Sequence, residues 1–236
     1  MRNKLVYIFL ILLISGSVFA QDKKKEKRKK VLGTQTSFGV QISPIIPTNL
    51  LQTNDVLKVT DTSMYSISNL LSYEFGMEIR HSFTKKFSLQ SGITFIRRNF
   101  DAKAELYSQN ESAHEKLKLI AYEIPVKLIG FVRLSDNIYM DIAGGLGFEM
   151  YPSNIYINHF YGQKTSWIQV AAIMDVGWEY RTRFNGTFHI GINYKLHFTD
   201  MMHVIYSNKY GTRIDYVDVS GNYLALNFKY FFPQKK

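Results

Sequence analysis

The sequence contains no cysteine among its 236 residues. Disulfides, thiolate metal sites and cysteine nucleophiles are therefore excluded. A lipoprotein anchor, which needs a cysteine directly after the export signal, is excluded as well. Beyond the first twenty residues the chain also lacks an apolar run of the roughly 20 residues that a transmembrane helix requires. The rest of the chain is therefore not a helical membrane protein.

A broad basic surface is also lacking, although the formal net charge is +10. Residues 21–30 (QDKKKEKRKK) alone contribute +5, and the first four residues contribute +2, so the remainder carries only +3. Nucleic acid is therefore not expected as a partner. We interpret residues 21–33 as a lysine-rich periplasmic tail that acts as a solvated spacer. The alternative is contact with anionic lipid head groups or cell-wall polymers.

The first twenty residues have the form of a secretory signal peptide. They combine a basic start, an apolar run from Leu5 to Ile14 and small residues that end at Ala20, after which we expect cleavage. The lysine run that follows opposes the usual charge asymmetry of exported chains. An uncleaved inner-membrane anchor with a cytoplasmic tail is therefore the alternative, but the apolar stretch is short for a span.

Alternation with a period of two runs through almost all of the remaining sequence. It is clearest in residues 187–198 (TFHIGINYKLHF), where every second residue is apolar and those between are polar or glycine. Such separation indicates a strand between two very different environments. Eight such segments are predicted as strands: residues 36–44, 71–83, 87–95, 118–132, 138–150, 168–181, 187–198 and 222–232.

The lengths and connections of these segments are typical of an outer-membrane barrel. They have 9 to 15 residues, enough for the roughly 9–11 that a tilted strand needs to cross a bilayer. Short turns near residues 84–86, 134–137 and 182–186 alternate with long loops near residues 47–69, 101–115, 151–164 and 199–221. We predict an all-β fold, an eight-stranded antiparallel up-and-down transmembrane β-barrel over residues 34–232, with both ends on the periplasmic, short-turn side.

Alternation alone leaves open which face points outward, since a soluble lipocalin-like barrel has apolar residues inside. Three features favour the membrane barrel: small residues on the polar face, aromatic residues near strand ends on the apolar face, and few Lys or Arg within the strands. The side chains expected to face lipid are Phe188, Ile190, Ile192, Val176 and Leu226, and those expected inside are Glu78, Glu123, Asp175 and Lys195.

Three stretches resemble a known family. They are residues 75–100 (FGMEIRHSFTKKFSLQSGITFIRRNF), residues 122–148 (YEIPVKLIGFVRLSDNIYMDIAGGLGF) and the aromatic last strand. Residues 35–232 are similar to the outer-membrane β-barrel domain proteins of the Bacteroidetes, often labelled PorT-like. The resemblance implies an envelope protein; PorT itself is implicated in a protein secretion system, and most relatives have no assigned activity. The family offers no catalytic motif to transfer.

The expected polar faces carry both charge signs, in Glu74, Glu78, Glu123, Asp141, Glu149, Asp175, Glu179, Arg80, Lys127, Arg181, Lys195 and Lys229. An eight-stranded barrel is just wide enough for its side chains, so we interpret this set as a salt-bridged plug, with a proton or ion path as the alternative. His189 and His197 are too far apart along one strand to share a metal ion, and His203 lies in a loop. We therefore predict no catalytic, cofactor or metal residues and no cofactor.

Two classes of function remain open. The first is a non-enzymatic barrel, monomeric in the outer membrane, that contacts lipid and acts through its long loops as a structural, adhesion or secretion-accessory component. Partners would then be other envelope or secretion-system proteins. The second is a lipid-modifying hydrolase, suggested by His197-Phe198-Thr199; a small-solute channel is a further alternative. The aromatic loop residues are Tyr65, Tyr107, Tyr156, Phe160, Tyr161, Tyr206, Tyr210 and Tyr216.

Overall fold

The computed structural model describes residues 35–48, 55–61, 63–107, 111–182, 184–207 and 213–233. Residues 34–236 form one compact unit. The predicted signal peptide (residues 1–20) and lysine-rich tail (residues 21–33) lie outside the described residues and stay predictions. No helix in the described ranges is long and apolar enough to cross a membrane.

Thirteen β-strands make up the regular structure of the described residues. They are β1 (Gln35–Ile46), β2 (Val56–Val59), β3 (Ser63–Ser82), β4 (Phe87–Leu106), β5 (Glu111–Arg133), β6 (Ile138–Met150), β7 (Ile155–Ile157), β8 (Phe160–Lys164), β9 (Ile168–Arg181), β10 (Thr187–His197), β11 (Asp200–Ser207), β12 (Arg213–Ser220) and β13 (Tyr223–Phe231).

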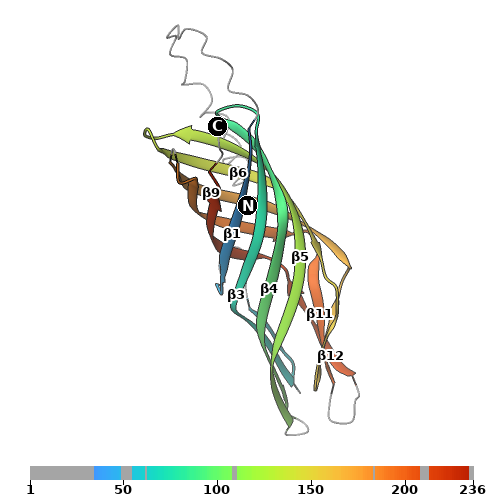
Figure 1. The fold of residues 1–236 in the computed structure, drawn as a ribbon. Helices are drawn as coiled ribbons and strands as arrows, with labels where there is room; N and C mark the ends of the chain where they lie inside the picture. The colour runs from blue at the N-terminus through green and yellow to red at the C-terminus, as the bar shows by residue number, and fades with distance from the viewer. Residues whose placement is uncertain are drawn as a thin grey trace, which may run out of the picture. The chain divides into compact units, whose positions relative to one another are not determined.

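Eight of these strands close into a ring (Figure 1). The pairing order is β1-β13-β10-β9-β6-β5-β4-β3, and β3 pairs again with β1, so no edge is left open. Every pairing around the ring is antiparallel. These eight strands are the eight predicted segments, which confirms the predicted antiparallel up-and-down barrel. The total strand number is higher than predicted, because the segments that connect the ring strands along the chain contain five further strands, which are not part of the ring.

The short connections lie where the sequence predicts them, between β3 and β4, β5 and β6, and β9 and β10. In the last of these turns the Thr182 hydroxyl donates to the carbonyl of Gly186 at 2.8 Å. Gly186 adopts a φ of 79°, which residues with a Cβ rarely reach. Glycine therefore suits this position of the turn.

Inside and outside of the barrel have the predicted polarity. Ile190 is 53% exposed on the outer face, whereas Glu78 is 1% exposed in the interior. Phe188, Ile192 and Val176 are exposed like Ile190; Leu226 is half-buried on the same outward face, opposite Ile192. Glu123, Asp175 and Lys195 are buried like Glu78. The soluble-barrel alternative, with apolar residues inside, is therefore wrong for this ring.

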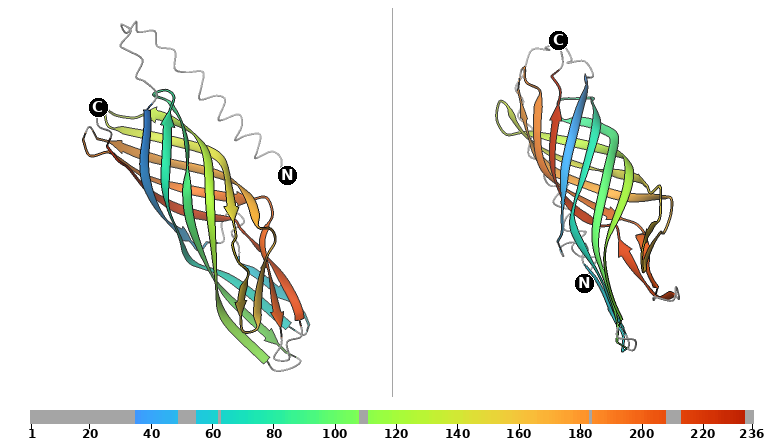
Figure 2. Two further views of the ribbon diagram at one scale, coloured as in Figure 1. Left: turned by 45° about the vertical axis from the view of Figure 1, so that its right-hand side comes forward. Right: turned by 60° about the horizontal axis from the view of Figure 1, so that its bottom comes forward.

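The predicted long loops are the main difference from the sequence analysis. Strands β3, β4 and β5 continue well beyond the ring, through most of residues 63–70, 96–106 and 111–119, and β2 pairs with β3 there. Residues 155–164 and 200–220 form a second sheet of four strands in the order β12-β11-β8-β7. Figure 2 shows both sheets at the same end of the barrel. We call this two-sheet unit the head.

The head has a hydrophobic core between its two sheets. Tyr65 from β3 and Phe160 from β8 each pack on the ring of Tyr206 from β11, at centroid distances of 5.8 and 5.5 Å. Other buried apolar members are Ile67, Phe100, Ala102, Ala104, Leu106, Leu117, Leu119, Ile155, Met202, Val204, Val217 and Val219. Segments that read as separate loops therefore fold together because each has an apolar side to bury.

Polar contacts join the two sheets of the head at their margins. Lys58 on β2 donates to Asp215 on β12 at 2.7 Å, and this hydrogen bond raises the pKa of Lys58. Tyr206 on β11 donates to Glu111 on β5 at 3.3 Å. Burial and the neighbouring carboxylate of Glu111 raise the pKa of the Tyr206 hydroxyl to about 12. These contacts hold the sheet edges together at neutral pH.

Candidate functional site

The barrel interior is filled by the charged residues that the sequence assigned to it. All seven acidic members of the set are at most 2% exposed, and the Lys members and Arg80 are at most 5% exposed. Arg181 is partly exposed near the turn end. In a barrel of this size such groups must pair with one another, because an unpaired buried charge is strongly disfavoured.

Ion pairs cross the middle of the lumen. The Lys229 ammonium lies 2.6 Å from Asp175 and 3.9 Å from Glu78. Lys127 approaches the same two carboxylates at 3.4 Å (Glu78) and 3.9 Å (Asp175). Two cations and two anions from β3, β5, β9 and β13 therefore form one alternating cluster. Lys127 on β5 thus finds its partners on β3 and β9, which are separated from β5 by one strand on either side of the ring.

A second cluster lies nearer the head. Lys195 on β10 places its ammonium 2.7 Å from both Glu74 on β3 and Glu123 on β5. The Tyr223 hydroxyl donates to Glu74 as well. The Glu123 carboxylate packs against the backbone of Gly147. A Cβ atom at position 147 would lie only 2.5 Å from Glu123 Oε2. The glycine-rich run at residues 144–147 therefore serves close packing at this point.

The turn end of the lumen holds a third cluster. Glu179 accepts hydrogen bonds from Arg80 and from Arg181. The Arg80 guanidinium stacks 3.8 Å from the centroid of the Phe231 ring, and the Arg181 guanidinium lies 4.0 Å from that of Tyr139. Charged and aromatic side chains thus cross the barrel at three levels along its axis.

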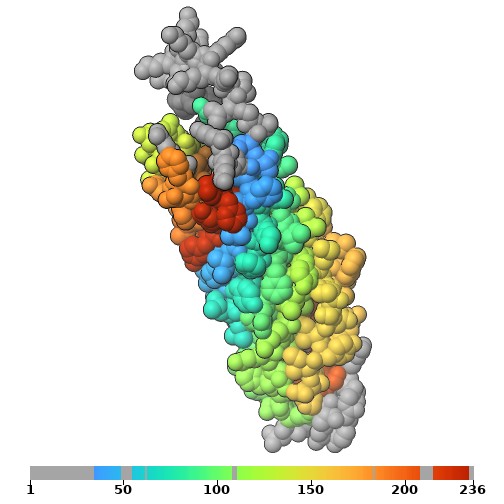
Figure 3. All heavy atoms as spheres, in the orientation of Figure 1, coloured from blue at the N-terminus to red at the C-terminus, as the bar shows by residue number. Residues whose placement is uncertain are grey.

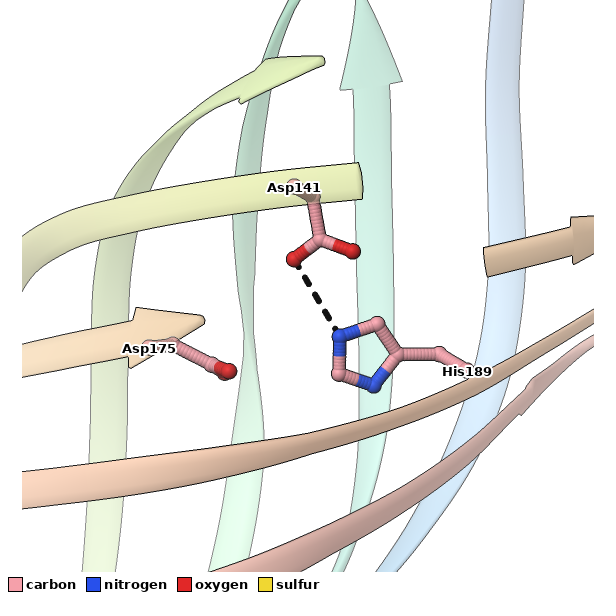
Figure 4. Close-up of side chains that lie close together, drawn as sticks. All are labelled: Asp141, Asp175 and His189. Carbon is pink, nitrogen blue, oxygen red and sulfur yellow. Dashed lines mark hydrogen bonds and ion pairs between the residues drawn. The ribbon is translucent and has the colours of Figure 1, made fainter. Parts of the chain in front are cut away.

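Asp141, Asp175 and His189 form the one group of donors among the described residues with the spacing of a metal site. The three side chains converge from β6, β9 and β10, and His189 Nε2 lies 3.2 Å from Asp141 Oδ1 (Figure 4). Asp175 Oδ2, however, already accepts from Lys229 at 2.6 Å and from Asn227 at 2.9 Å. The nearby Lys ammonium groups oppose a second cation, so the geometry favours an Asp141–His189 pair within the ionic network.

His197 does not form a hydrolytic dyad with Thr199. Its ring points inward and lies 3.1 Å from Glu149, which also accepts from Tyr151. Thr199 is exposed, beyond the end of β10. Because His197 and Thr199 point into different environments, the sequence motif is not matched by an arrangement that could activate the Thr199 hydroxyl.

The head carries a hollow that sequence reasoning missed. It has a volume of about 420 Å³ and lies at the β7–β8 hairpin. Tyr156 is 75% exposed there and stacks on Tyr161 at a centroid distance of 4.4 Å. Asn158 at the turn has a φ of 42°, the left-handed region, and donates to Glu115 on β5. The remaining lining residues are Ile157, His159, Phe160 and Ser207.

The aromatic residues predicted in the loops divide into two groups. Tyr65, Phe160 and Tyr206 are buried in the core of the head, whereas Tyr107, Tyr156 and Tyr216 are more than half exposed. Tyr210 lies outside the described residues. Tyr161 is half-buried. The buried members pack segments of the head together, and the exposed members lie at its surface. The sequence held no signal for the division, because it depends on which hairpins meet.

Comparisons with known proteins support the fold. No protein-family model and no curated protein matches the chain. Among solved structures, the chain is similar to the crystal structure of the outer membrane protein OprG from Pseudomonas aeruginosa, with a TM-score of 0.54 and 10% sequence identity. The match covers 85% of this chain and 98% of OprG.

An identity of 10% shows the fold alone. Together with the closed ring and its outward apolar belt, the match identifies the fold as an outer-membrane β-barrel. The outer face of β5 from Ile120 to Val132 is apolar at nearly every outward position. This length corresponds to about 40 Å of strand, or about 30 Å along the axis of a tilted barrel, which matches a bilayer. The chain is a β-barrel of the outer membrane.

Proposed function

We propose that this protein is a non-enzymatic outer-membrane barrel that presents its head, outside the cell, as a recognition surface for other envelope or secretion-system proteins. The observation that carries the proposal is the head itself. Five strands beyond the eight of the ring, together with the extensions of β3, β4 and β5, build a unit with its own hydrophobic core. A chain that served only as a membrane plug would need none of these strands.

Three further points belong to the same proposal. The barrel acts as a monomer without a cofactor, since its ring is closed and its interior is filled by its own side chains. The lumen conducts little, because ion pairs cross it at three levels. The resemblance of residues 75–100 and 122–148 to PorT-like proteins of the Bacteroidetes supports an accessory role in secretion or adhesion.

The hollow at the β7–β8 hairpin is the part of the head best suited to binding. Tyr156 and Tyr161 offer aromatic surface at low entropic cost, and aromatic residues are enriched in protein interfaces. Asn158 in the hairpin turn donates a hydrogen bond to Glu115 on β5, and this contact attaches the hairpin that forms the hollow to the barrel-derived sheet. An aromatic hollow on a segment that a folded scaffold holds in place is a common form of recognition site.

Photo-crosslinking in native membranes tests the proposal. A photoreactive phenylalanine analogue at position 156 should yield a discrete adduct with another envelope protein. The matched control places the same analogue at Tyr107, which is also more than half exposed and lies at the far tip of the β4–β5 hairpin. Absence of an adduct at 156, or the same adducts at both positions, would count against the hollow as a binding site.

Two experiments address the alternatives to this proposal. Large, stable conductance steps of the purified protein in planar bilayers would favour a small-solute channel. Acyl release from lipopolysaccharide or phospholipid, detected by mass spectrometry and abolished by His197→Ala, would favour the hydrolase. We expect neither result, given the filled lumen and the separation of His197 from Thr199.

A further inference from the structure

The outer face of β4 and β5 changes from apolar to basic at one level of the barrel. Phe95 on β4 lies opposite Tyr122 on β5, and both belong to the apolar belt. The next outward position on β4 is Arg97, opposite Ile120, and the next outward position on β5 is Lys118. Figure 3 shows these strands as one continuous face from the barrel to the head. The two cations therefore lie directly beyond the aromatic margin of the belt.

Among the residues that the structure describes, Arg97 and Lys118 have no partner of opposite charge. None of the ion pairs or side-chain hydrogen bonds within the described ranges involves either side chain. As diagonal neighbours on paired antiparallel strands, their Cα atoms lie about 7–8 Å apart, which lets both side chains reach one group between them. Two free cations this close repel each other unless an anion joins them.

The strand that carries Arg97 is held firmly at this level. The side chain of Arg98, the next residue along β4, points inward. It donates to the carbonyl of Gly221 at 2.9 Å and to the Asn69 side chain at 3.2 Å, and its guanidinium stacks on the Tyr223 ring. The backbone at Arg97 is thereby fixed to both the barrel and the head. An anion bound by Arg97 and Lys118 would therefore meet strands whose backbone is already fixed at this level.

We propose that Arg97 and Lys118 bind the phosphate of an anionic membrane lipid whose acyl chains lie along the outward side chains of Ile93, Phe95 and Ile124. The acyl part needs an apolar wall that reaches the level of the head groups, and the belt on β4 and β5 supplies it. The phosphate needs cations at the margin of that wall, because aromatic residues such as Tyr122 mark the membrane–water interface. Both requirements are met on the same two strands.

Charges farther from the belt behave differently. Asp101, two positions beyond Asn99 on β4, is already paired with His114 at 2.6 Å and with Lys103 at 3.5 Å. Lys103 therefore lies on the same outer face as Arg97 and Lys118, but its charge is paired with Asp101 and it lies farther from the apolar belt than they do. It provides the matched control for Arg97 and Lys118.

Native mass spectrometry of the detergent-purified full chain with added phosphatidylglycerol tests the proposal. The wild type should retain one phosphatidylglycerol in preference to phosphatidylcholine, which carries no net charge. The double variant Arg97→Gln/Lys118→Gln should lose affinity for phosphatidylglycerol by about tenfold or more. Inorganic phosphate at millimolar concentration should not displace the lipid, since it lacks the acyl chains; displacement would overturn the assignment to a lipid.

The control variants decide whether the loss reflects this site. Lys103→Gln should bind phosphatidylglycerol like the wild type, and Arg97→Lys/Lys118→Arg, which keeps both charges, should bind within about twofold of it. Folding of each variant is checked by heat-dependent migration on gels, and the charge-preserving variant carries the test if the glutamine variant does not fold. Unchanged binding by a folded glutamine variant, equal loss in Lys103→Gln, or loss of binding in the charge-preserving variant would each contradict the proposal.

Discussion

The barrel and the head are built in part from the same three strands, yet their insides are opposite. In the barrel, β4 directs Ser88, Gln90 and Thr94 inward and Phe87 outward. In the head, the same strand buries Phe100, Ala102, Ala104 and Leu106 and exposes Lys103 and Glu105. The difference follows from the surroundings, because lipid favours apolar side chains on the outside whereas water favours them within.

The chain reverses its polarity by two different means. In β4 and β5 the sequence itself changes phase, at adjacent apolar residues: Phe95-Ile96 in β4 and Leu119-Ile120 in β5. In β3 the apolar residues stay at odd positions from Tyr65 to Ile79, and the backbone changes instead. A bulge between Leu70 and Tyr73 inserts one extra residue, so that odd residues face inward in the head and outward in the barrel. All three changes lie at the same level of the sheet.

Deleting a residue from β3 within the barrel should have the largest effect. Removal of Met77 shifts part of β3 by one residue against its neighbouring strands. Every side chain in the shifted part then points to the opposite face of the sheet. Either Glu78 and Arg80 then face lipid, or Glu74 faces lipid while Phe75 faces the lumen. We expect no folded barrel, measured as the loss of heat-dependent migration on gels.

Deleting Leu71 instead is the matched control. In the bulge, Leu71 and Ser72 lie opposite the single residue Arg98, and Leu71 is an additional outward residue, 67% exposed. Its removal leaves each inward side chain on its face, so the barrel should still fold. Equal outcomes for the two deletions would show that the bulge does not set the polarity of β3.

Removing a buried cation should be the next largest effect. Lys195→Met leaves Glu74 and Glu123 in the lumen without their shared partner, at a cost of about 3–5 kcal/mol. Lys103→Met on the outside of the head breaks only an exposed pair and should cost less than about 1 kcal/mol. Urea unfolding in lipid vesicles measures both. A loss below about 1 kcal/mol for Lys195→Met would mean that the lumen is hydrated.

An arginine introduced on the outer surface should be costly in the barrel and nearly without cost in the head. Ile190→Arg places a charge in the lipid-facing belt and should cost about 2–4 kcal/mol near the bilayer midplane. Glu105→Arg on the outer face of the head should stay within about 0.5 kcal/mol of the wild type. Unfolding from vesicles compares the two, and similar costs would contradict the assignment of the belt to lipid.

The smallest effect concerns pH and is confined to the head. Partial burial by itself raises the pKa of the Asp101 carboxyl, but the hydrogen bond from His114 and the charges of His114 and Lys103 lower it further than burial raises it. Because the folded-state pKa lies below the unfolded-state value, the stabilisation is present above the ordinary Asp pKa near 4 and is lost as the pH falls through the lowered value.

An Asp101→Asn variant isolates this contribution. The difference from the wild type in the free energy of unfolding of the head should be less than about 1 kcal/mol at pH 6 and should shrink towards pH 2. Hydrogen exchange of the β4–β5 hairpin measures it against the barrel strands. A difference that grows on acidification would reverse the assigned direction of the pKa shift.

The strands of the ring and the faces of their side chains could be predicted from the sequence. In residues 187–198 apolar and polar side chains alternate without exception, and only a strand between lipid and a polar lumen suits such a pattern. The charged residues expected in the lumen are buried there for the same reason, except that Arg181 is partly exposed at the turn end. The predicted aromatic margins, with Tyr73, Trp178 and Phe198 exposed on the outer face, also follow from local pattern.

The head could not be predicted with the same means. Its strands β2 and β7 have four and three residues, too few for a period to be recognised. The change of phase at Phe95-Ile96 was a signal that β4 continues, but the alanines at 102 and 104 carry little apolar character. The hollow near Tyr156 depends on the contact between Asn158 and Glu115, residues 43 positions apart.

The sequence by itself therefore determined the barrel strands, their polarity and the residues of the lumen, because alternation is a local property and the bilayer makes it strict. Only the tertiary structure decided that Lys195 serves both Glu74 and Glu123, and that the hairpins beyond the ring share one hydrophobic core. The reason is physical: the pairing of charges across a lumen depends on the closure and stagger of the ring. The joining of two sheets likewise depends on apolar faces that meet only after the ring has brought them to the same end.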